Sequence, residues 1–347
     1  MKGVNRDHFG VTTAGVSVDR FTLENASGAR ARIIALGATV TELHVPDRND
    51  MLADVVLGFG SAAGYEKNEP YMGCIVGRVA NRISNAHFTL DGTEYQLARN
   101  LEPHHLHGGT VGFHQRIWEA EILERASAPA VKFSYLSPDG EENYPGNLNA
   151  QVIYSLTEEN GLRIEYEATT DHATPVNLTN HSYFNLTGSG AGTILDHEIT
   201  VHSDYVAERD PDGVPTGQIL EVEGTPLDFR VPKRIGERIT ELECGYDHNY
   251  VFAGSSRENA EFVAEAYDSV SGRRMAVWTT EPGMQLYSGS FLNGYKGKAG
   301  AVYDQYTGFC FETQHFPDAV NKPHFPDVTL RPGQTYRQTT EYRFEAE

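Results

Sequence analysis

The 347-residue chain has few cysteines and no long apolar run. Its three cysteines, Cys74, Cys244 and Cys310, are odd in number and widely separated, which argues against a disulfide framework and favours free thiols in a reducing compartment. The sequence contains no run of about 18 apolar residues, and residues 1–10 lack the apolar core of a signal peptide. We therefore expect a cytoplasmic protein with no membrane partner.

Basic residues are also scarce relative to acidic ones. Lys and Arg total 28 against 48 Asp and Glu, which gives a formal net charge of -20. Such a field repels phosphate backbones and anionic surfaces. It excludes nucleic acid as an expected partner and favours a neutral small molecule as the ligand.

Helical periodicity is rare, and most of the chain is typical of short β-strands separated by Gly, Asp and Asn. We predict hairpins over residues 88–97, turning at Asp91-Gly92, over 152–168, turning at Asn160-Gly161, and between 262–267 and 275–278. The best candidate for a helix is residues 235–242. With no linker longer than a turn and no repeat of fixed period, the pattern predicts one all-β domain over residues 1–347.

Histidines gather in the segment 104–109, where His104, His105 and His107 precede two glycines. On a strand, His105 and His107 would share one face, as a metal site in a β-barrel requires. Residues 108–116 contain no carboxylate, however, and the next is Glu119, which disfavours a metal. The segment is then either an exposed loop or, because glycine permits close backbone approach, part of a ligand site.

A second segment, residues 174–186, has many amides and hydroxyls for a buried strand. Alternation places Asn177, Thr179, His181 and Tyr183 on one face. Such a polar face is either solvated or lines a binding cleft, where amides, hydroxyls and rings hold sugar hydroxyls.

A third segment, residues 308–314, contains Glu312 inside an aromatic strand. Alternation directs Phe309 and Phe311 to the core and leaves Glu312 on the other face, beside Cys310 and Gln314. Partial burial would raise the pKa of Glu312 toward the range of a general base. The alternative is an ordinary solvent-facing glutamate on an edge strand.

Three further polar residues occur in strand-like surroundings: Arg82, Asp247 and Gln285. A carboxylate accepts hydroxyl protons and an amide both donates and accepts, so Asp247 and Gln285 together suit vicinal sugar hydroxyls. Arg82 suits a hydroxyl or a ring oxygen. Alternatively, Arg78 and Arg82 pair with surplus surface acid.

Taken in order, these segments resemble the aldose 1-epimerase (galactose mutarotase) family from about Phe9 to the C-terminus. The resemblance rests on the following stretches: PD at 46–47, LGF at 57–59, GRVANRI at 77–83, LHGG at 106–109 with GF at 112–113 and Trp118, NLTNHSYFNL at 177–186, GYDHN at 245–249, PGMQLYSG at 282–289 and GFCFETQ at 308–314. A departure is His104, where the family usually has Asn three positions before the site histidine.

The resemblance implies a large antiparallel β-sandwich of the galactose mutarotase type, with few short helices and an open cleft that binds a free hexose. It implies that Glu312 is the base and His181 the acid beside the ring oxygen. The residues that it implies hold the sugar are Asn81, Arg82, His107, Tyr183, Asp247 and Gln285. It implies no cofactor and no metal.

The expected activity is therefore that of an aldose 1-epimerase, which interconverts the α and β anomers of free hexoses such as galactose and glucose by acid-base ring opening and reclosure. Two alternatives stay open: a hexose-phosphate epimerase, which needs additional cations around the phosphate, and a non-catalytic sugar-binding protein. The preferred aldose depends on hydroxyl geometry that sequence does not give, and no pattern distinguishes a monomer from a homodimer.

Overall fold

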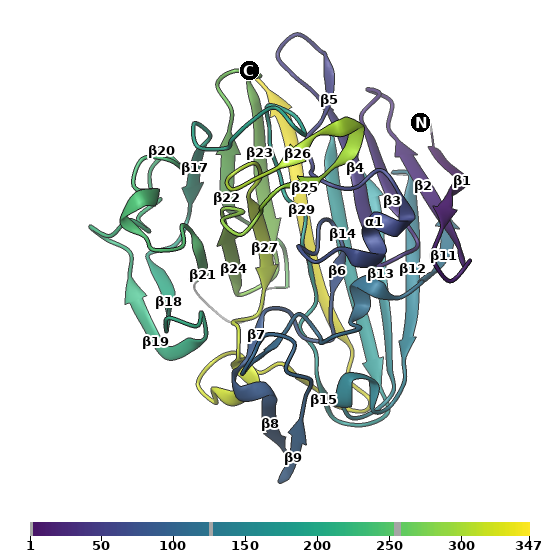
Figure 1. Cartoon of the computed structure of the whole chain (residues 1–347), viewed down its shortest axis with the longest axis vertical. Helices are drawn as coiled ribbons and strands as arrows, with labels where there is room; N and C mark the ends of the chain where they lie inside the picture. The colour runs from purple at the N-terminus through teal and green to yellow at the C-terminus, as the bar shows by residue number, and fades with distance from the viewer. Residues whose placement is uncertain (1–2, 125–127, 253–257) are drawn as a thin grey trace.

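The computed structural model describes residues 3–124, 128–252 and 258–347, and strands dominate it (Figure 1). Its largest sheet has nine antiparallel strands in the order β11-β12-β13-β14-β29-β23-β22-β17-β20. In that order the strands are Glu119–Leu123, Ala130–Ser137, Leu148–Leu156, Gly161–Thr170, Tyr336–Ala346, Arg273–Thr279, Glu261–Tyr267, Glu198–Val201 and Lys233–Arg234. The C-terminal strand β29 lies in the middle of this sheet, so it joins the strands of the first half of the chain to those of the second.

Alternation of apolar and polar side chains explains why these strands form a sheet with one buried face. On β13, Leu148, Ala150, Val152 and Tyr154 are fully buried in the core, whereas Asn149 is exposed on the opposite face. Successive side chains of a strand point to opposite faces, so this pattern covers one face with core.

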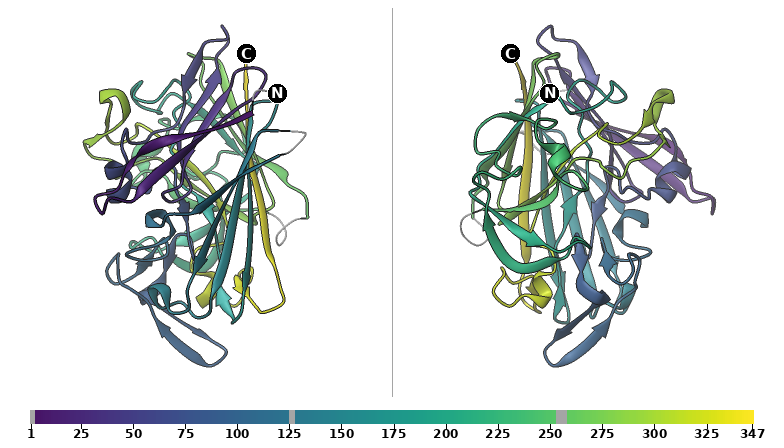
Figure 2. Two further views of the ribbon diagram at one scale, coloured as in Figure 1. Left: turned by 90° about the vertical axis from the view of Figure 1, so that its right-hand side faces the viewer. Right: turned by 60° about the vertical axis from the view of Figure 1, so that its left-hand side comes forward.

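An N-terminal sheet of five strands in the order β1 to β5 packs across this core (Figure 2). Its strands are Gly3–Val11, Ser17–Glu24, Arg30–Ile34, Thr39–Pro46 and Leu52–Asp54. The two sheets contact each other at Phe21 and Phe133, whose rings pack edge to face with centroids 5.5 Å apart. Such edge-to-face contacts add to the burial that holds two sheets together.

The third sheet also has five strands, in the order β19-β18-β21-β24-β27. They are Pro215–Glu221, Tyr205–Arg209, Asp247–Val251, Gly283–Tyr287 and Cys310–Gln314. Pairs of shorter strands complete the fold: β6 Ile75–Val76 with β16 Thr179–Asn180, β7 Arg82–Ile83 with β10 His105–Leu106, β8 His87–Leu90 with β9 Thr93–Gln96, β15 Thr174–Pro175 with β28 Thr329–Leu330, and β25 Tyr295–Lys296 with β26 Val302–Tyr303.

Helices are short. Within the described ranges the α-helix is α1, Ala62–Lys67, and the 3₁₀ turns are Ser84–Ala86, Phe113–Gln115, Glu141–Asn143, Ile239–Glu241, Lys298–Gly300 and Ala319–Asn321. The helix predicted over residues 235–242 is wrong, because only its single 3₁₀ turn is helical. The N–H groups of Ile235 and Gly236 donate to the carbonyls of His197 and Leu195, so tertiary hydrogen bonds replace helical ones.

The hairpins predicted from sequence are confirmed as β8–β9, β13–β14 and β22–β23. The predicted class, all-β with few short helices, is also confirmed. In the part of the chain that the structure describes, we find no helix with the length and apolar character needed to cross a bilayer.

Candidate active site

His181 directly follows the short strand β16 and is held by backbone hydrogen bonds on both sides. Its N–H donates to the Cys74 carbonyl over 2.9 Å, and its own carbonyl accepts from the Gly73 N–H over 2.9 Å. These bonds extend the pairing of β16 with β6. They fix the backbone of His181, which is only 4% exposed.

The polar segment before His181 proves to be neither solvated nor wholly part of a cleft. The Asn177 amide donates to the His315 carbonyl over 3.2 Å, and the Thr179 hydroxyl donates to the Thr313 carbonyl over 2.8 Å. Both side chains thus tie the segment to β27 and its extension. His181 and Tyr183 alone of the four predicted residues line the pocket described below.

Glu312 lies at the centre of β27, paired with Gln285 on β24. The predicted alternation is confirmed, since Phe309 and Phe311 belong to the main apolar core while Glu312 lines the pocket. Although β27 is an edge strand of its sheet, Glu312 is only 2% exposed. The alternative of a solvent-facing glutamate is therefore wrong, because other segments cover this edge.

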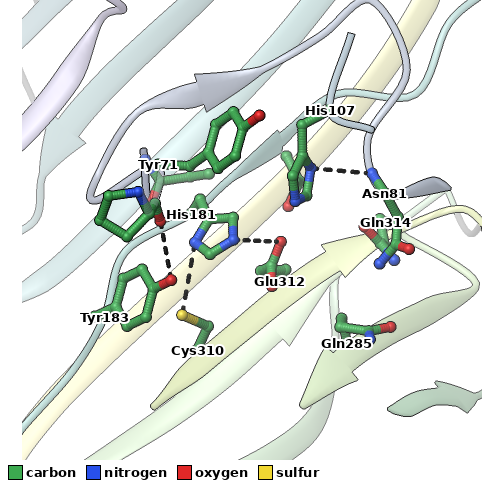
Figure 3. Close-up of polar contacts among 12 residues, drawn as sticks. Tyr71, Asn81, His107, His181, Tyr183, Gln285, Cys310, Glu312 and Gln314 are labelled. Carbon is green, nitrogen blue, oxygen red and sulfur yellow. Dashed lines mark hydrogen bonds and ion pairs between the residues drawn. The ribbon is translucent and has the colours of Figure 1, made fainter. Parts of the chain in front are cut away.

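His181 and Glu312 face each other without a hydrogen bond (Figure 3): His181 Nε2 lies 3.6 Å from Glu312 Oε2. That oxygen is buried and has no hydrogen-bond partner in the structure. Burial raises the pKa of Glu312 well above its usual range, with the charge of Asp247 adding to the effect and Arg82 opposing it. Burial lowers the pKa of His181 to about 4. Burial thus acts on both groups in favour of their neutral forms.

His107 lies next to this pair, with its ring centroid 5.2 Å from that of His181. Its backbone is left-handed, with φ of 50°, and its Nδ1 accepts a hydrogen bond from the Asn81 N–H over 3.1 Å. Burial lowers the pKa of His107 well below its usual value, and the charges of His181 and Arg82 act in the same direction. The neutral ring therefore carries its proton on Nε2, which can donate to a ligand.

His105 does not share a face with His107, so the metal pair considered from sequence is excluded. Both ring nitrogens of His105 are bound to protein groups, Nδ1 to the Ala98 carbonyl and Nε2 to the Tyr144 hydroxyl, each over 2.8 Å. The left-handed turn at His107 breaks the strand alternation on which the shared face depended.

Asp247, at the start of β21, is a second carboxylate that lines the pocket. Arg82 Nη2 lies 3.4 Å from Asp247 Oδ2, and the Gln285 amide donates to Asp247 Oδ1 over 2.6 Å. Burial acts to raise the pKa of Asp247, but Arg82 and the Gln285 hydrogen bond outweigh it and lower the pKa. The lowered pKa of Asp247 favours its ionised form, whereas burial favours the neutral form of Glu312.

Gln285 differs from the other predicted site residues because it does not line the pocket. It lies beneath Asp247, and its Oε1 is buried without a partner. Further buried side-chain atoms without partners are Arg82 Nε, Gln314 Oε1 and Glu312 Oε2. Unpaired polar atoms are rare in protein interiors, and because Arg82 and Glu312 both line the pocket, their unpaired atoms indicate a site for a polar ligand.

The pocket itself has a volume of about 210 Å³. Seven of the eight predicted site residues line it: Asn81, Arg82, His107, His181, Tyr183, Asp247 and Glu312. Sequence reasoning missed the remaining lining residues, which are mainly apolar or aromatic: Glu69, Pro70, Tyr71, Leu106, Tyr287, Phe291, Leu292 and Tyr295. Tyr287 was within reach of the sequence, because it lies two positions after Gln285 on the same strand face.

Charge in the pocket does not suit a phosphate. Among the described lining residues, Arg82 is the sole Arg or Lys, and it already pairs with Asp247. Two acidic side chains, Glu69 and Asp247, line the same space, as does Glu312, whose neutral form burial favours. A phosphorylated sugar would therefore meet repulsion without a free cation to offset it.

Among the residues that the structure describes, two groups of side chains have the spacing to hold a cation. Ligand atoms of His107, His181 and Glu312 lie within 4.8 Å of one another, as do those of a second group, Glu42, His44 and Asp54. In the second group, Arg32 and Lys298 already neutralise Glu42 and Asp54. The first group coincides with the pair described above, and its spacing serves proton transfer equally well.

Two residues singled out in the sequence hold loops and do not line the pocket. His104, which stands where the family usually has Asn, accepts a hydrogen bond at Nδ1 from the Asn85 N–H over 3.1 Å. Buried Arg78 donates to the carbonyls of Ser137, Pro138 and Pro145 over 2.9 to 3.0 Å. The surface ion pair considered for Arg78 is therefore wrong.

Known proteins share this fold and sequence over nearly the whole chain. Residues 19–343 match the family model described as aldose 1-epimerase. The galactose mutarotase of Bos taurus is 46% identical, and the match covers 99% of each chain. The aldose 1-epimerase of Escherichia coli K12 is 34% identical over 94% of this chain and 95% of its own.

Solved structures agree. An aldose epimerase homologue from C. elegans superposes with a TM-score of 0.86 and 34% identity, covering 94% of this chain and 98% of the other. Galactose 1-epimerase from Lactobacillus acidophilus superposes with a TM-score of 0.85 and 28% identity, covering 99% and 98%. With a family model and full-length relatives matching in sequence as well as fold, the chain belongs to the aldose 1-epimerase family.

Proposed function

We propose that this protein is an isomerase that interconverts the α and β anomers of free hexoses such as galactose and glucose, with Glu312 as the base and His181 as the acid. The observation that carries the assignment is the pair itself. Glu312 and His181 face each other across 3.6 Å in a buried polar pocket, and neither is tied up by a hydrogen bond to the other.

Anomer interconversion needs two proton transfers. Glu312 takes the proton of the anomeric hydroxyl while His181 gives a proton to the ring oxygen, so the C1–ring oxygen bond breaks and an aldehyde forms. Rotation about C1–C2 then presents the other face of the carbonyl. The ring oxygen attacks it, His181 takes its proton back, and Glu312 returns a proton to the new anomeric hydroxyl.

The perturbed pKa values support this division of roles. A carboxylate with a raised pKa is a stronger base, and an imidazolium with a lowered pKa is a stronger acid. The raised pKa of Glu312 and the lowered pKa of His181 favour the form in which the one proton shared by the pair is on Glu312. Transfer of that proton to His181 produces the reactive carboxylate and imidazolium, so sugar binding needs no proton from solvent.

The remaining polar groups around the pocket suit the other sugar hydroxyls. His107 offers an Nε2–H donor, Asp247 an ionised acceptor and Arg82 further donors. Gln285 acts through Asp247, which it holds by a hydrogen bond. Asn81 fixes His107, and Tyr183 packs its ring against His181 at 5.1 Å between centroids.

Mutarotation of freshly dissolved α-galactose or α-glucose, followed by polarimetry, tests the proposal. We expect Glu312→Gln to slow turnover by roughly 10²- to 10⁴-fold, because the amide cannot take the anomeric proton. Circular dichroism and thermal unfolding should show an intact fold. If Glu312→Gln catalyses mutarotation at the wild-type rate, Glu312 is not the base.

The same assay separates the other functions. Equal or better turnover of glucose 6-phosphate than of glucose would favour a sugar-phosphate epimerase, which the acidic pocket makes unfavourable. Sugar binding by calorimetry without any acceleration of mutarotation would favour a binding protein.

Three free cysteines support a reducing compartment as the place where the protein works, which would be the cytoplasm.

A further inference from the structure

A buried thiol that the proposed reaction leaves unused touches the acid. Cys310 Sγ lies 3.6 Å from His181 Nδ1, and Cys310 is fully buried. Cys310 precedes Glu312 by two positions on β27, so both side chains lie on the same face of the strand. The imidazole is thus held between two side chains of one strand, Glu312 at Nε2 and Cys310 at Nδ1 (Figure 3).

The chemistry of the acid requires a particular arrangement of ring protons. If Nε2 is to give a proton to the ring oxygen and then take it back, Nδ1 must keep its own proton throughout the cycle. A buried N–H needs an acceptor, since leaving it unpaired costs about 1–3 kcal/mol of desolvation. A thiol sulfur is a weak acceptor and a weak donor, so Cys310 can accept this hydrogen bond.

We propose that Cys310 is a positioning residue, whose Sγ accepts the Nδ1–H of His181 and so keeps Nε2 as the nitrogen that exchanges its proton with the sugar. The inference rests on the proposed role of His181 as the acid. It adds a residue that acts on the tautomer of His181 without touching the substrate.

A neutral sulfur suits this position better than the carboxylate that often orients a catalytic histidine. Burial raises the pKa of the Cys310 thiol well above its usual value, so the sulfur carries no charge. A carboxylate at Nδ1 would stabilise the imidazolium and weaken it as an acid. The other titratable side chains close to the imidazole are Tyr71, His107, His114, Tyr183, Asp247, Tyr287 and Glu312.

Two substitutions of Cys310 test the proposal by their kinetics. We expect Cys310→Ala to lower kcat for α-galactose by roughly fivefold, with little change in KM, because one weak hydrogen bond to the acid is lost. The acid limb of its pH profile should move to lower pH, since the imidazolium loses an acceptor that the neutral ring can replace by changing tautomer. Cys310→Ser, whose hydroxyl also accepts, should restore kcat.

Nitrogen-15 NMR of the His181 ring gives a readout that a merely structural role would not move. Nδ1 should be protonated in wild type and in Cys310→Ser, whereas Cys310→Ala should show a shift toward the Nε2–H tautomer. Cys74→Ala is the matched control, because it removes a second buried thiol that donates instead to the Tyr71 carbonyl over 3.1 Å. It should leave the His181 tautomer as in wild type.

Two outcomes would overturn the proposal. One is a Cys310→Ala protein with the wild-type tautomer and pH profile, whatever its kcat. The other is a Cys310→Ser protein as impaired as Cys310→Ala while both keep the wild-type tautomer. Failure of the proposed function would be seen differently, as wild-type protein that does not accelerate mutarotation or as a fully active Glu312→Gln variant.

Discussion

Two buried histidine–carboxylate pairs lie near each other along β27, and they are built differently. His181 Nε2 and Glu312 Oε2 are 3.6 Å apart, and that oxygen has no hydrogen-bond partner. His315, the residue after β27, binds Glu281 through Nδ1 over 2.6 Å. The second oxygen of Glu281 accepts the Tyr336 hydroxyl over 3.2 Å. We call His181–Glu312 the loose pair, because one carboxylate oxygen has no partner, and His315–Glu281 the tight pair, because both carboxylate oxygens are hydrogen-bonded.

Their electrostatics differ accordingly. Burial acts to lower the pKa of both histidines, and it does so for His181, which reaches about 4. For His315 the charge and hydrogen bond of Glu281 outweigh burial, so its pKa is raised. A buried pair in good geometry holds its charges in place, whereas a pair without a hydrogen bond is ready to exchange protons with a ligand.

The tight pair also supports the loose one. The backbone N–H of His315 donates to Asn177 Oδ1 over 3.0 Å, and Asn177 belongs to the segment that leads to His181. Glu281 precedes β24, which carries Gln285, and His315 follows β27, which carries Glu312. We infer that the His315–Glu281 pair is structural and the His181–Glu312 pair reactive, and the following predictions test that difference.

The largest expected effect is on turnover at the loose pair. His181→Ala should lower kcat for mutarotation by roughly 10²- to 10⁴-fold, because the ring oxygen loses its proton donor. The variant should still unfold in one cooperative thermal transition, with only the stability lost that comes from the buried ring and its contact with Cys310 Sγ. Polarimetry and calorimetry on the same preparation check both, and wild-type kcat would contradict the role of His181.

A change at the tight pair should have the opposite character. Glu281→Gln should lower the free energy of unfolding by about 1.5–3 kcal/mol, because a charged hydrogen bond is lost, and should lower kcat far less than Glu312→Gln. Urea unfolding and polarimetry measure the two quantities. The comparison fails if Glu281→Gln loses as much rate as Glu312→Gln while keeping its stability.

Asp247→Ala should give an intermediate effect on the site. It removes a hydroxyl acceptor and leaves Arg82 without its partner, so we expect KM to rise and kcat to fall, each by roughly tenfold. Loss of the Asp247 charge should also lower the pKa of Glu312, because that charge now helps to raise it. Initial rates measured across sugar concentrations separate KM from kcat, and an unchanged KM would argue against a binding role.

The smallest effects are expected in pH dependence, where the two pairs should differ in sign. The kcat/KM of wild type should fall as pH drops through about 4, because His181 then takes up a proton while Glu312 keeps its own and no base remains. His315 has a raised pKa, so its contribution to stability is complete below the usual value of 6.5 and is lost as pH rises through the raised value.

The contribution of the His315 charge to stability is isolated by measuring the free energy of unfolding of wild type and of Glu281→Gln from pH 5 to pH 10. Their difference should shrink as pH rises. A constant difference would show that the His315 charge does not contribute. If the acid limb of kcat/KM is the same in Cys310→Ala and in wild type, Cys310 does not act through the pKa of His181.

Much of the fold followed from local pattern, and part of the site did not. Alternation on residues 308–314 correctly put Phe309 and Phe311 in the core and Glu312 opposite them. The same rule failed for His105 and His107, because the strand ends at Leu106 and the left-handed backbone of His107 breaks the alternation. It also failed to reveal that Asn177 and Thr179 hold β27 in place, since their partners lie more than 130 residues away.

The sequence by itself determined the all-β class, the hairpins and the family, because strand periodicity, turn residues and ordered motifs are local properties of the chain. Only the tertiary structure decided which carboxylate is free and which is bound. Glu281 and Glu312 are both buried glutamates beside a histidine, and what separates them is 1.0 Å of distance and one oxygen without a partner, 3.6 Å against 2.6 Å. Those quantities depend on how segments far apart in sequence pack together, which no local pattern encodes.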